Sequence, residues 1–318
     1  MIGARQFSSV ESAGAAIGRE RPLYLAIGMF DGVHLGHRAV IETAIRSARR
    51  NGGLSAVLTF RPHPSRILSP RRPTRLIHDP DTQAGLLSEL GVDAAIFEPF
   101  TPEFARIEAG EFLPWLRRRL PSVAAVHVGS NWRFGAGRNG DVASLVESAR
   151  GTGLSVCSVP PFQFDGEPVN STRIRALLES GEIARANALL GYTYFARGKV
   201  IAGKRLGRSL GFPTLNLPWA PELAPRFGVY FVRVCGRGVS LPGVANYGLR
   251  PTVEQASVPQ IETHVLGDCP LDAGDAVTVE WLESLRPERV FSGVGELRDR
   301  IGVDVREARA WFARHGQP

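Results

Sequence analysis

Apolar runs of strand length alternate with stretches of helical periodicity through the first half of the chain. The strand-like runs cover residues 23–27, 54–60, 94–97, 124–129 and 154–159. Apolar positions at helical spacing fill the intervals at 33–50, 81–90, 102–120 and 141–150. Apolar strands that alternate with helices are typical of a parallel sheet covered on both faces, so we predict an α/β domain here.

The pattern changes after residue 190. A helical stretch at 182–190 is followed by short strand-like runs with Gly and Pro between them, at 194–201, 228–235, 241–247, 260–266 and 276–282. This spacing predicts an antiparallel β-barrel. A final helix carries apolar residues on one face, namely Val294, Leu297, Ile301, Val305, Ala308, Trp311 and Phe312. We place the boundary near 187–192 and predict domains at 1–187 and 188–318.

The charge of the chain narrows the classes of partner. Its 38 Lys and Arg residues exceed its 31 Asp and Glu residues, and the net charge of +7 suits nucleic acids or phosphorylated small molecules. The arginines are spread along the chain apart from 117–119, which end a helical stretch where cations are favoured. Because no nucleic-acid-binding motif accompanies the charge, we expect no nucleic-acid partner.

Cysteines and apolar runs indicate the compartment. Cys157, Cys235 and Cys269 are odd in number and widely spaced, which disfavours a disulfide framework or a Cys-based metal site. The N-terminal residues lack the apolar core of a signal peptide, and no apolar run reaches membrane length. We expect a cytoplasmic protein without a membrane partner, as a monomer or a weak homo-oligomer.

The stretch Gly28-Met-Phe-Asp-Gly-Val-His-Leu-Gly-His37 joins the first predicted strand of this pattern to its helix. Its glycines let the backbone pass close to a ligand, and the helix start offers unpaired N–H groups to a phosphate. His34 and His37 project from one side of the first turn, where imidazoles can donate to a phosphate that gains charge in a transition state. Capping or surface histidines are an equally weighted alternative, whereas no nearby Cys or carboxylate supports a metal site.

Three further loops carry candidate binding residues. Phe60-Arg-Pro-His-Pro64 has two prolines that fix an extended turn, with His63 as a structural or binding residue. The loop at 128–137 presents an amide, an indole, a guanidinium and a phenyl ring, which suit a planar aromatic ligand with a phosphate tail. In Asn170-Ser-Thr-Arg-Ile-Arg175, hydroxyls and guanidiniums gather at a helix start and predict a polyphosphate site, with capping alone as the alternative.

The second half carries its chemistry in Gly203-Lys-Arg-Leu-Gly-Arg-Ser-Leu-Gly-Phe-Pro-Thr-Leu-Asn216. The Gly-Lys-Ser/Thr order of a P-loop is absent, but glycines and cations alternate in a flap able to cover phosphates. Thr214 and Asn216 are alternate positions, so both face one way in an extended segment. A hydroxyl and an amide oxygen can share a Mg²⁺ ion. The alternative is a basic turn without function.

Over about residues 22–312 these motifs resemble, in order, those of the bacterial bifunctional riboflavin kinase/FMN adenylyltransferase (FAD synthetase) family. The resemblance implies a Rossmann-like nucleotidyltransferase domain followed by a riboflavin kinase barrel that ends in a helix. Barrel landmarks also follow in family order, at 228–230, 244–252, 261–264 and 285–291. The departures from the family pattern are Trp132 for Phe, Asn170 for Ser, Leu215 for Ala, and a segment at 267–275 that is shorter and lacks a Tyr.

The resemblance implies roles for individual residues. For adenylyl transfer, catalysis is implied for His34 and His37, and ATP or phosphate binding for Gly28, Phe30, Asp31, Gly32, Gly36, Ser171, Thr172 and Arg175. Flavin binding in the same domain is implied for Phe60, His63 and Asn131. For the kinase, phosphate binding is implied for Gly203, Lys204, Gly207, Arg208 and Gly211, a Mg²⁺ site for Thr214 and Asn216, and proton abstraction from the flavin ribityl 5′-hydroxyl for Glu262.

The implied function is flavin cofactor synthesis. Riboflavin is phosphorylated with MgATP to FMN, and FMN is adenylylated with ATP to FAD and pyrophosphate. The altered segment at 267–275 motivates one alternative, an FMN adenylyltransferase whose barrel binds flavin with weak or lost kinase activity. A second alternative is a non-catalytic protein that binds flavin or nucleic acid.

Overall fold

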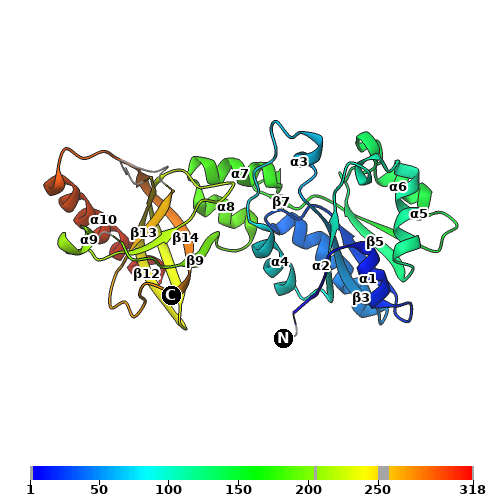
Figure 1. Ribbon diagram of the computed structural model, residues 1–318, viewed down its shortest axis with the longest axis horizontal. Coiled ribbons are helices and arrows are strands. Elements are labelled where there is room, and N and C mark those ends of the chain that lie inside the picture. The colour runs from blue at the N-terminus through cyan, green and yellow to red at the C-terminus, as the bar shows by residue number, and fades with distance from the viewer. Residues whose placement is uncertain (1–2, 204–205, 250–257, 317–318) are drawn as a thin grey trace. The chain divides into compact units, whose positions relative to one another are not determined.

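The computed structural model describes residues 3–203, 206–249 and 258–316, which fall into two compact units, Met1–Ser171 and Thr172–Pro318 (Figure 1). The predicted functional domains, 1–187 and 188–318, divide the chain further along. The residues between the two boundaries, 172–187, belong to the second compact unit, but this does not show which reaction they serve. The functional division at 187 therefore stays a prediction.

The first unit is built on a six-stranded sheet in the order β1-β4-β3-β2-β5-β6, in which every neighbouring pair is parallel. Its strands are β1 (Arg5–Phe7), β2 (Leu23–Ile27), β3 (Leu54–Arg61), β4 (Ala94–Pro99), β5 (Val123–Gly129) and β6 (Ser155–Val159). The other elements are α1 (Val10–Ile17), α2 (Leu35–Arg50), α3 (Ser65–Leu68), α4 (Pro80–Glu89), η1 (Phe104–Arg106), α5 (Ala109–Arg119), η2 (Ala136–Arg138), α6 (Val142–Ala149), and the hairpin strands β7 (Gln163–Phe164) and β8 (Glu167–Pro168). The predicted parallel α/β domain is confirmed.

Helices cover both faces of this sheet. Alternate residues of β2 to β5 pack in one core with the buried faces of α1, α5 and α6. The helix α2 packs on β2, β3 and β5 and buries Val40, Ile41, Ala44, Ile45 and Ala48, none of which belongs to that core. It therefore covers the opposite face. The carboxyl ends of β2 and β5, neighbours in the sheet, emerge side by side, which is where ligands bind in such folds.

Two predicted helices begin or continue differently in the structure. The stretch 102–120 is not one helix but η1 and α5, because Ile107 is extended and its carbonyl accepts from the N–H of Ala136 at 2.8 Å. The stretch from Val33 becomes helical only at Leu35, because Val33 has a left-handed backbone. The elements β1 and α1 were not predicted, since β1 is only 3 residues long and has no apolar run.

The second unit contains an antiparallel six-stranded sheet in the order β10-β13-β12-β11-β14-β9. Its elements are α7 (Ser171–Ser180), α8 (Ile183–Leu190), β9 (Phe195–Lys199), α9 (Leu206–Ser209), β10 (Leu215–Pro218), β11 (Gly228–Gly236), β12 (Val239–Gly248), β13 (Gln260–Val265), β14 (Ala276–Pro287) and α10 (Val294–His315). The N–H of Ile201 donates to the carbonyl of Asn216 at 2.8 Å and joins the two edges, so the sheet is a nearly closed barrel. The predicted barrel with a terminal helix is confirmed, although β10 was missed.

The two faces of the barrel sheet have different environments. Tyr247, Trp281 and Tyr230 contact one another inside the barrel and are fully buried. Outside, Val229, Phe231 and Val244 pack against the apolar face of α10, through Val305, Ala308 and Phe312. Residues that alternate with the aromatic core therefore lie on the outer face.

Candidate active sites

The loop between β2 and α2 is held in a rarely populated backbone conformation. Phe30 has φ 48°, Gly32 has φ 82° and Val33 has φ 40°. The side chains of Phe30 and Val33 are buried. A left-handed backbone at a bulky residue costs about 1–3 kcal/mol and persists only where its surroundings impose it. Strain of this kind is concentrated at binding sites, which makes this loop a candidate site.

Hydrogen bonds from the surrounding elements impose that conformation. The buried Asp31 carboxylate accepts from the N–H of Ile77 at 3.0 Å, and the Asp31 carbonyl accepts from the Ser171 hydroxyl at 3.0 Å. The Met29 carbonyl accepts from the Thr59 hydroxyl and the Gln83 amide, both at 2.9 Å. Hydrogen bonds from four separate parts of the chain thus hold the loop in this conformation.

The two histidines of the loop lie side by side at the start of α2. Their rings are stacked, with centroids 3.5 Å apart and planes at 18°. His34 is the N-cap, 4% exposed, and its Nδ1 accepts from the N–H of His37 at 3.2 Å. The edge of Phe30 packs on His37 at 5.3 Å between centroids. His34 therefore caps the helix, which is one of the two roles that the sequence predicts for these histidines. The cap fixes both imidazoles at the positive end of a helix dipole.

Other predicted phosphate-binding residues surround this helix start. A Cβ on Gly36 would lie 3.2 Å from His34 Cε1 and from the Val169 carbonyl oxygen, so a side chain there would have to displace these neighbours by a few tenths of an ångström. Ser171 bonds to the loop as described. Thr172 and Arg175 lie in α7, in the second compact unit, so their part in the same site stays a prediction.

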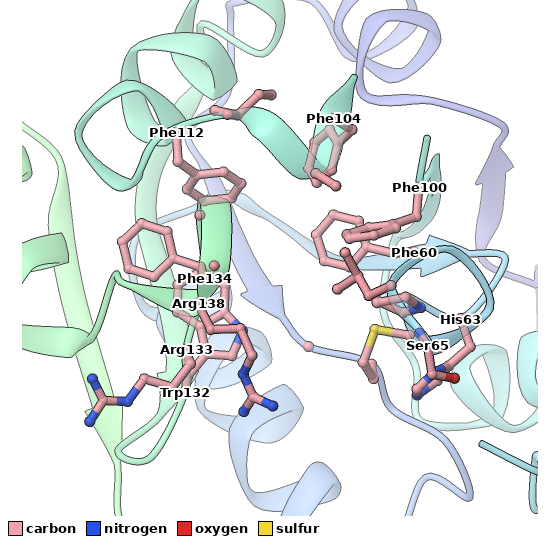
Figure 2. A pocket seen from close by; sticks show the side chains of 18 of the residues that line it. Phe60, His63, Ser65, Phe100, Phe104, Phe112, Trp132, Arg133, Phe134 and Arg138 are labelled. Atoms are coloured by element: carbon pink, nitrogen blue, oxygen red, sulfur yellow. The ribbon is translucent and has the colours of Figure 1, made fainter. Parts of the chain in front are cut away.

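An aromatic pocket of about 690 Å³ opens next to this loop (Figure 2). Its walls come from the ends of β3, β4 and β5 and from η1, α3 and α5, and it begins at Gly28 and Met29. The aromatic residues that line it are Phe60, Phe100, Phe104, Phe112, Trp132 and Phe134. All three predicted flavin-binding residues, Phe60, His63 and Asn131, line this pocket. Because Gly28 and Met29 of the loop between β2 and α2 line the pocket, a ligand in it would contact that loop.

The loop after β5 forms one wall of the pocket. Trp132 and Phe134 are stacked at 4.6 Å between centroids and 11° between planes, and Phe112 packs against both. Arg133 pairs with Asp141 at 3.4 Å, and Arg138 lines the same wall in Figure 2. Sequence reasoning missed Phe100, Phe104 and Phe112 as pocket residues, because Phe100 lies in a connection without periodicity and the other two lie within the single helix predicted over 102–120. Their density in the string Phe97-Glu-Pro-Phe100 to Phe104 was the available signal.

In the second unit, the predicted metal and base residues are neighbours in the barrel sheet. Asn216 on β10 lies directly opposite Glu262 on β13. Asn216 is 5% exposed, and its amide donates to the Thr214 carbonyl at 3.2 Å. His264 Nδ1 lies 2.9 Å from the Pro213 carbonyl oxygen, which holds the segment before β10 against β13.

The predicted phosphate flap packs directly on Asn216. A Cβ on Gly203 would lie 2.8 Å from Asn216 Cγ, so only glycine lets the flap backbone pass there. The Gly207 carbonyl accepts from the N–H of Phe212 at 2.7 Å and closes the turn at α9, which contains Arg208; Gly211 follows with φ 89°. The predicted Lys204 lies outside the described residues.

The donor set suits a hard cation. The Thr214 hydroxyl and the amide oxygen of the buried Asn216 are oxygen donors of the kind that can bind such a cation, and Glu262, opposite Asn216, adds a carboxylate. Mg²⁺ takes few protein oxygens and keeps sites for water and phosphate. Within the described ranges, no group of three His, Cys, Asp or Glu side chains could hold a metal ion.

Comparison with known families covers both units. The family model for FAD synthetase matches residues 17–173, and the family model for riboflavin kinase matches residues 190–312. Among curated proteins, the bifunctional riboflavin kinase/FMN adenylyltransferase of Escherichia coli K12 is 36% identical over 294 residues, covering 91% of this chain and 92% of the relative. The enzyme of the same name from Bacillus subtilis is 33% identical over 293 residues, with the same coverage.

A solved structure has the same fold. The crystal structure of a protein named macrolide-efflux protein, from Streptococcus pneumoniae, is similar with a TM-score of 0.86 at 26% identity, covering 98% of this chain and 100% of that one. In the part of this chain that the structure describes, none of the helices is long and apolar enough to span a membrane.

Proposed function

The chain belongs to the bifunctional riboflavin kinase/FMN adenylyltransferase family, and from that membership we propose how its residues divide the two reactions. The enzyme phosphorylates riboflavin to FMN with ATP and adenylylates FMN to FAD, with release of pyrophosphate. The riboflavin kinase match at 190–312 spans the shortened segment 267–275, so nothing favours a barrel of weak or lost activity.

Adenylyl transfer takes place in the first unit. The flavin ring occupies the aromatic pocket, with Asn131 and His63 on its polar edge and Phe60 among the rings around it. The FMN phosphate then attacks the α-phosphorus of ATP, and the bond to pyrophosphate breaks. No general base is needed, because the phosphate is already ionised. His34 and His37 donate to the oxygens that gain charge, and the strained loop holds them in place.

Phosphates of ATP lie at helix starts. The N–H groups at the start of α2, together with the backbone at Gly28, Gly32 and Gly36, face the α-phosphate. Ser171, Thr172 and Arg175 bind the pyrophosphate half of the nucleotide.

Riboflavin phosphorylation takes place at the outer face of the barrel. The Glu262 carboxylate takes the proton of the ribityl 5′-hydroxyl as its oxygen bonds to the γ-phosphorus. Thr214 and Asn216 hold Mg²⁺, which when bound neutralises charge on the ATP phosphates. The flap residues Gly203, Lys204, Gly207, Arg208 and Gly211 cover those phosphates.

We further propose that the enzyme works in the cytoplasm as a monomer or a weak homo-oligomer, without nucleic-acid or membrane partners. Free Cys157, Cys235 and Cys269 suit a reducing compartment.

The observation that carries the first assignment is the aromatic pocket that begins at the phosphate loop. Phe104 packs on Phe60 and Phe100 at 5.3 and 5.6 Å between centroids, so Phe104→Leu removes a ring from its wall. We expect the KM for FMN to rise about tenfold, since such ring contacts contribute about 0.5–1.5 kcal/mol beyond burial. The KM for ATP should be nearly unchanged.

The matched control is Phe162→Leu, a change at a ring that is 39% exposed and does not line the pocket. Equal KM values for FMN in the two variants would contradict the proposal that flavin binds in this pocket.

A further inference from the structure

One backbone carbonyl in the loop between β2 and α2 accepts two hydrogen bonds from side chains outside the loop. The Met29 carbonyl oxygen accepts from the Thr59 hydroxyl on β3 and from the Gln83 side-chain amide on α4, each at 2.9 Å. A carbonyl oxygen has two lone pairs, so these two donors use its full capacity. Thr59 is fully buried, and neither donor lines the aromatic pocket or has a part in the reactions as proposed above.

The bonded carbonyl belongs to the peptide unit that precedes the strained Phe30. Because a peptide unit is planar, holding the Met29 oxygen also holds the N–H of Phe30. Phe30 has φ 48°, a backbone conformation that a bulky residue rarely adopts without support from its surroundings. Rotation of this peptide unit would let the backbone at Phe30 relax, but it would break both hydrogen bonds. Thr59 and Gln83 therefore oppose that relaxation.

The backbone conformation of Phe30 decides where its ring lies. The ring turns back over Gly28, where a Cβ would lie 2.9 Å from Phe30 Cζ. It also packs against His37, with centroids 5.3 Å apart and planes at 84°. His37 is in turn stacked on His34. A series of direct contacts thus leads from the two donors, through the peptide unit before Phe30, to the histidine pair.

We propose that Thr59 and Gln83 are positioning residues of adenylyl transfer, which act by holding the Phe30 ring against His37. Imidazoles that are already held in place need no reorganisation when charge develops on the reacting phosphate, which lowers the barrier of the chemical step. The inference rests on the proposed roles of His34 and His37.

The test is the kinetics of FAD formation from FMN and ATP in Thr59→Val and Gln83→Met. Each substitution removes one donor and nearly keeps the size of the side chain. We expect kcat to fall about tenfold in each variant, as for the loss of one hydrogen bond that supports the site. The KM values for FMN and ATP should change little, because the histidines act in the chemical step. Wild-type kcat in both variants would overturn the proposal.

Thr59→Ser and Thr43→Val are the matched controls. Thr59→Ser keeps the hydroxyl and should retain most of the wild-type kcat. Thr43 of α2 donates its hydroxyl to the Ala39 carbonyl at 2.6 Å, so Thr43→Val removes the same kind of bond elsewhere in the first unit and should leave kcat unchanged. Riboflavin kinase activity should be unchanged in every variant. A tenfold fall in either control would contradict the assignment.

A double-mutant cycle with Phe30→Leu tests the path of contacts. Phe30→Leu removes the ring that Thr59 is proposed to hold, so adding Thr59→Val to it should lower kcat much less than tenfold. A full tenfold effect in that background would show that Thr59 does not act through Phe30.

His37→Asn separates the possible failures. If His37→Asn is inactive in adenylyl transfer while Thr59→Val and Gln83→Met keep the wild-type kcat, the inference is wrong and the role of His37 stands. If His37→Asn forms FAD at the wild-type rate, the proposed role of His37 is wrong and the inference falls with it.

Discussion

At the scale of single residues, the proposed kinase centre requires glycine at position 203, where a side chain would press on Asn216. A Cβ at Gly203 would lie 2.8 Å from Asn216 Cγ and 3.0 Å from Oδ1. We expect Gly203→Ala to displace the amide and to lower riboflavin kinase activity by roughly ten- to a hundredfold, the equivalent of about 1–3 kcal/mol of overpacking. Activity with FMN should be unchanged.

The matched control for that substitution is Gly267→Ala, where a Cβ would meet no atom within 4 Å. Paired flavin assays of the two variants measure the effect. Equal kinase activity in both would show that the flap does not press on Asn216.

A buried histidine makes the first unit sensitive to acid. His127 on β5 is 2% exposed, and neither ring nitrogen has a hydrogen-bond partner in the described part of the chain. Burial lowers its pKa from 6.5 to about 4. Above pH 6.5 the ring is neutral both folded and unfolded. As the pH falls toward 4, only the unfolded chain takes the proton, so stability is lost over that window.

We expect the free energy of unfolding of the wild type to fall by about 2 kcal/mol between pH 7 and pH 5 because of His127. The His127→Leu variant should lack this decrease. Urea unfolding of both proteins at the two pH values measures the difference. At pH 7 the variant should be at least as stable as the wild type, because it removes two unpartnered polar atoms from the interior. A parallel decline in both proteins would assign the acid sensitivity to other groups.

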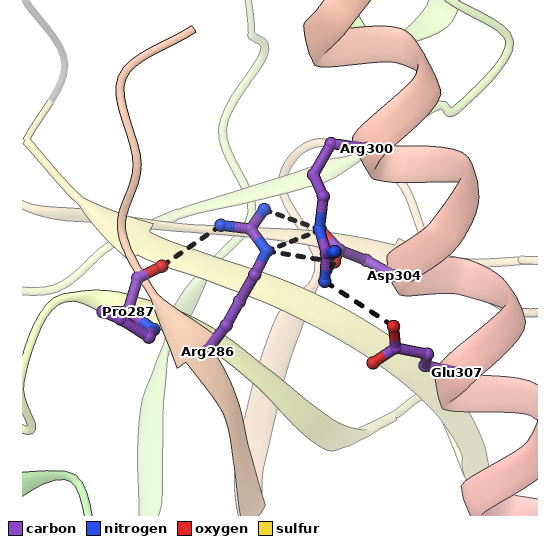
Figure 3. Close-up of polar contacts among 5 residues, drawn as sticks. All are labelled: Arg286, Pro287, Arg300, Asp304 and Glu307. Atoms are coloured by element: carbon purple, nitrogen blue, oxygen red, sulfur yellow. Dashed lines mark hydrogen bonds and ion pairs between the residues drawn. The ribbon is translucent and has the colours of Figure 1, made fainter.

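At the scale of elements, the terminal helix is attached to the barrel by an ion cluster (Figure 3). Asp304 of α10 is 3% exposed and accepts from Arg286 of β14 at 2.6 Å and from Arg300 at 2.8 Å. Removing one partner of a buried pair leaves the other charge uncompensated and costs about 3–5 kcal/mol. We expect Asp304→Asn to lower the free energy of unfolding by about 3 kcal/mol.

The comparison variant is Glu307→Gln. Glu307 lies 3.6 Å from Arg300 and its side chain is 45% exposed, so its loss should cost no more than about 0.5 kcal/mol. Urea denaturation followed by circular dichroism measures both. Similar losses in the two variants would mean that the cluster is screened by solvent and does not hold the helix.

Elements with strong periodicity could be predicted from sequence, and those set by long-range contacts could not. The apolar strand β2 was predicted with its observed bounds, 23–27. The break before α5 depends on a bond between Ile107 and Ala136, which no local pattern contains. The left-handed backbone of Phe30 and Val33 is likewise imposed by the surrounding fold.

For the sites, motifs along the chain indicated the candidate residues, but they could not show which of those residues lie next to each other in space. The motifs indicated Asn216 and Glu262 separately, and register on the sheet makes them neighbours.

At the scale of the whole molecule, most residues proposed for the two reactions lie in different compact units, although Thr172 and Arg175, proposed for adenylyl transfer, belong to the second unit. The aromatic pocket and stacked histidines lie in the first, and the pair of Asn216 and Glu262 lies in the second. The product of the second unit is the substrate of the first. The two activities should therefore be lost independently by substitution.

Conversion of riboflavin by the full chain tests that claim most directly. Wild type, Glu262→Gln and His37→Asn are incubated with riboflavin and MgATP, and riboflavin, FMN and FAD are resolved by chromatography over time. The wild type should pass through FMN to FAD. Glu262→Gln should leave riboflavin unconverted yet form FAD from supplied FMN, and His37→Asn should accumulate FMN. Loss of both activities in both variants would contradict the claim that separate sets of residues carry out the two reactions.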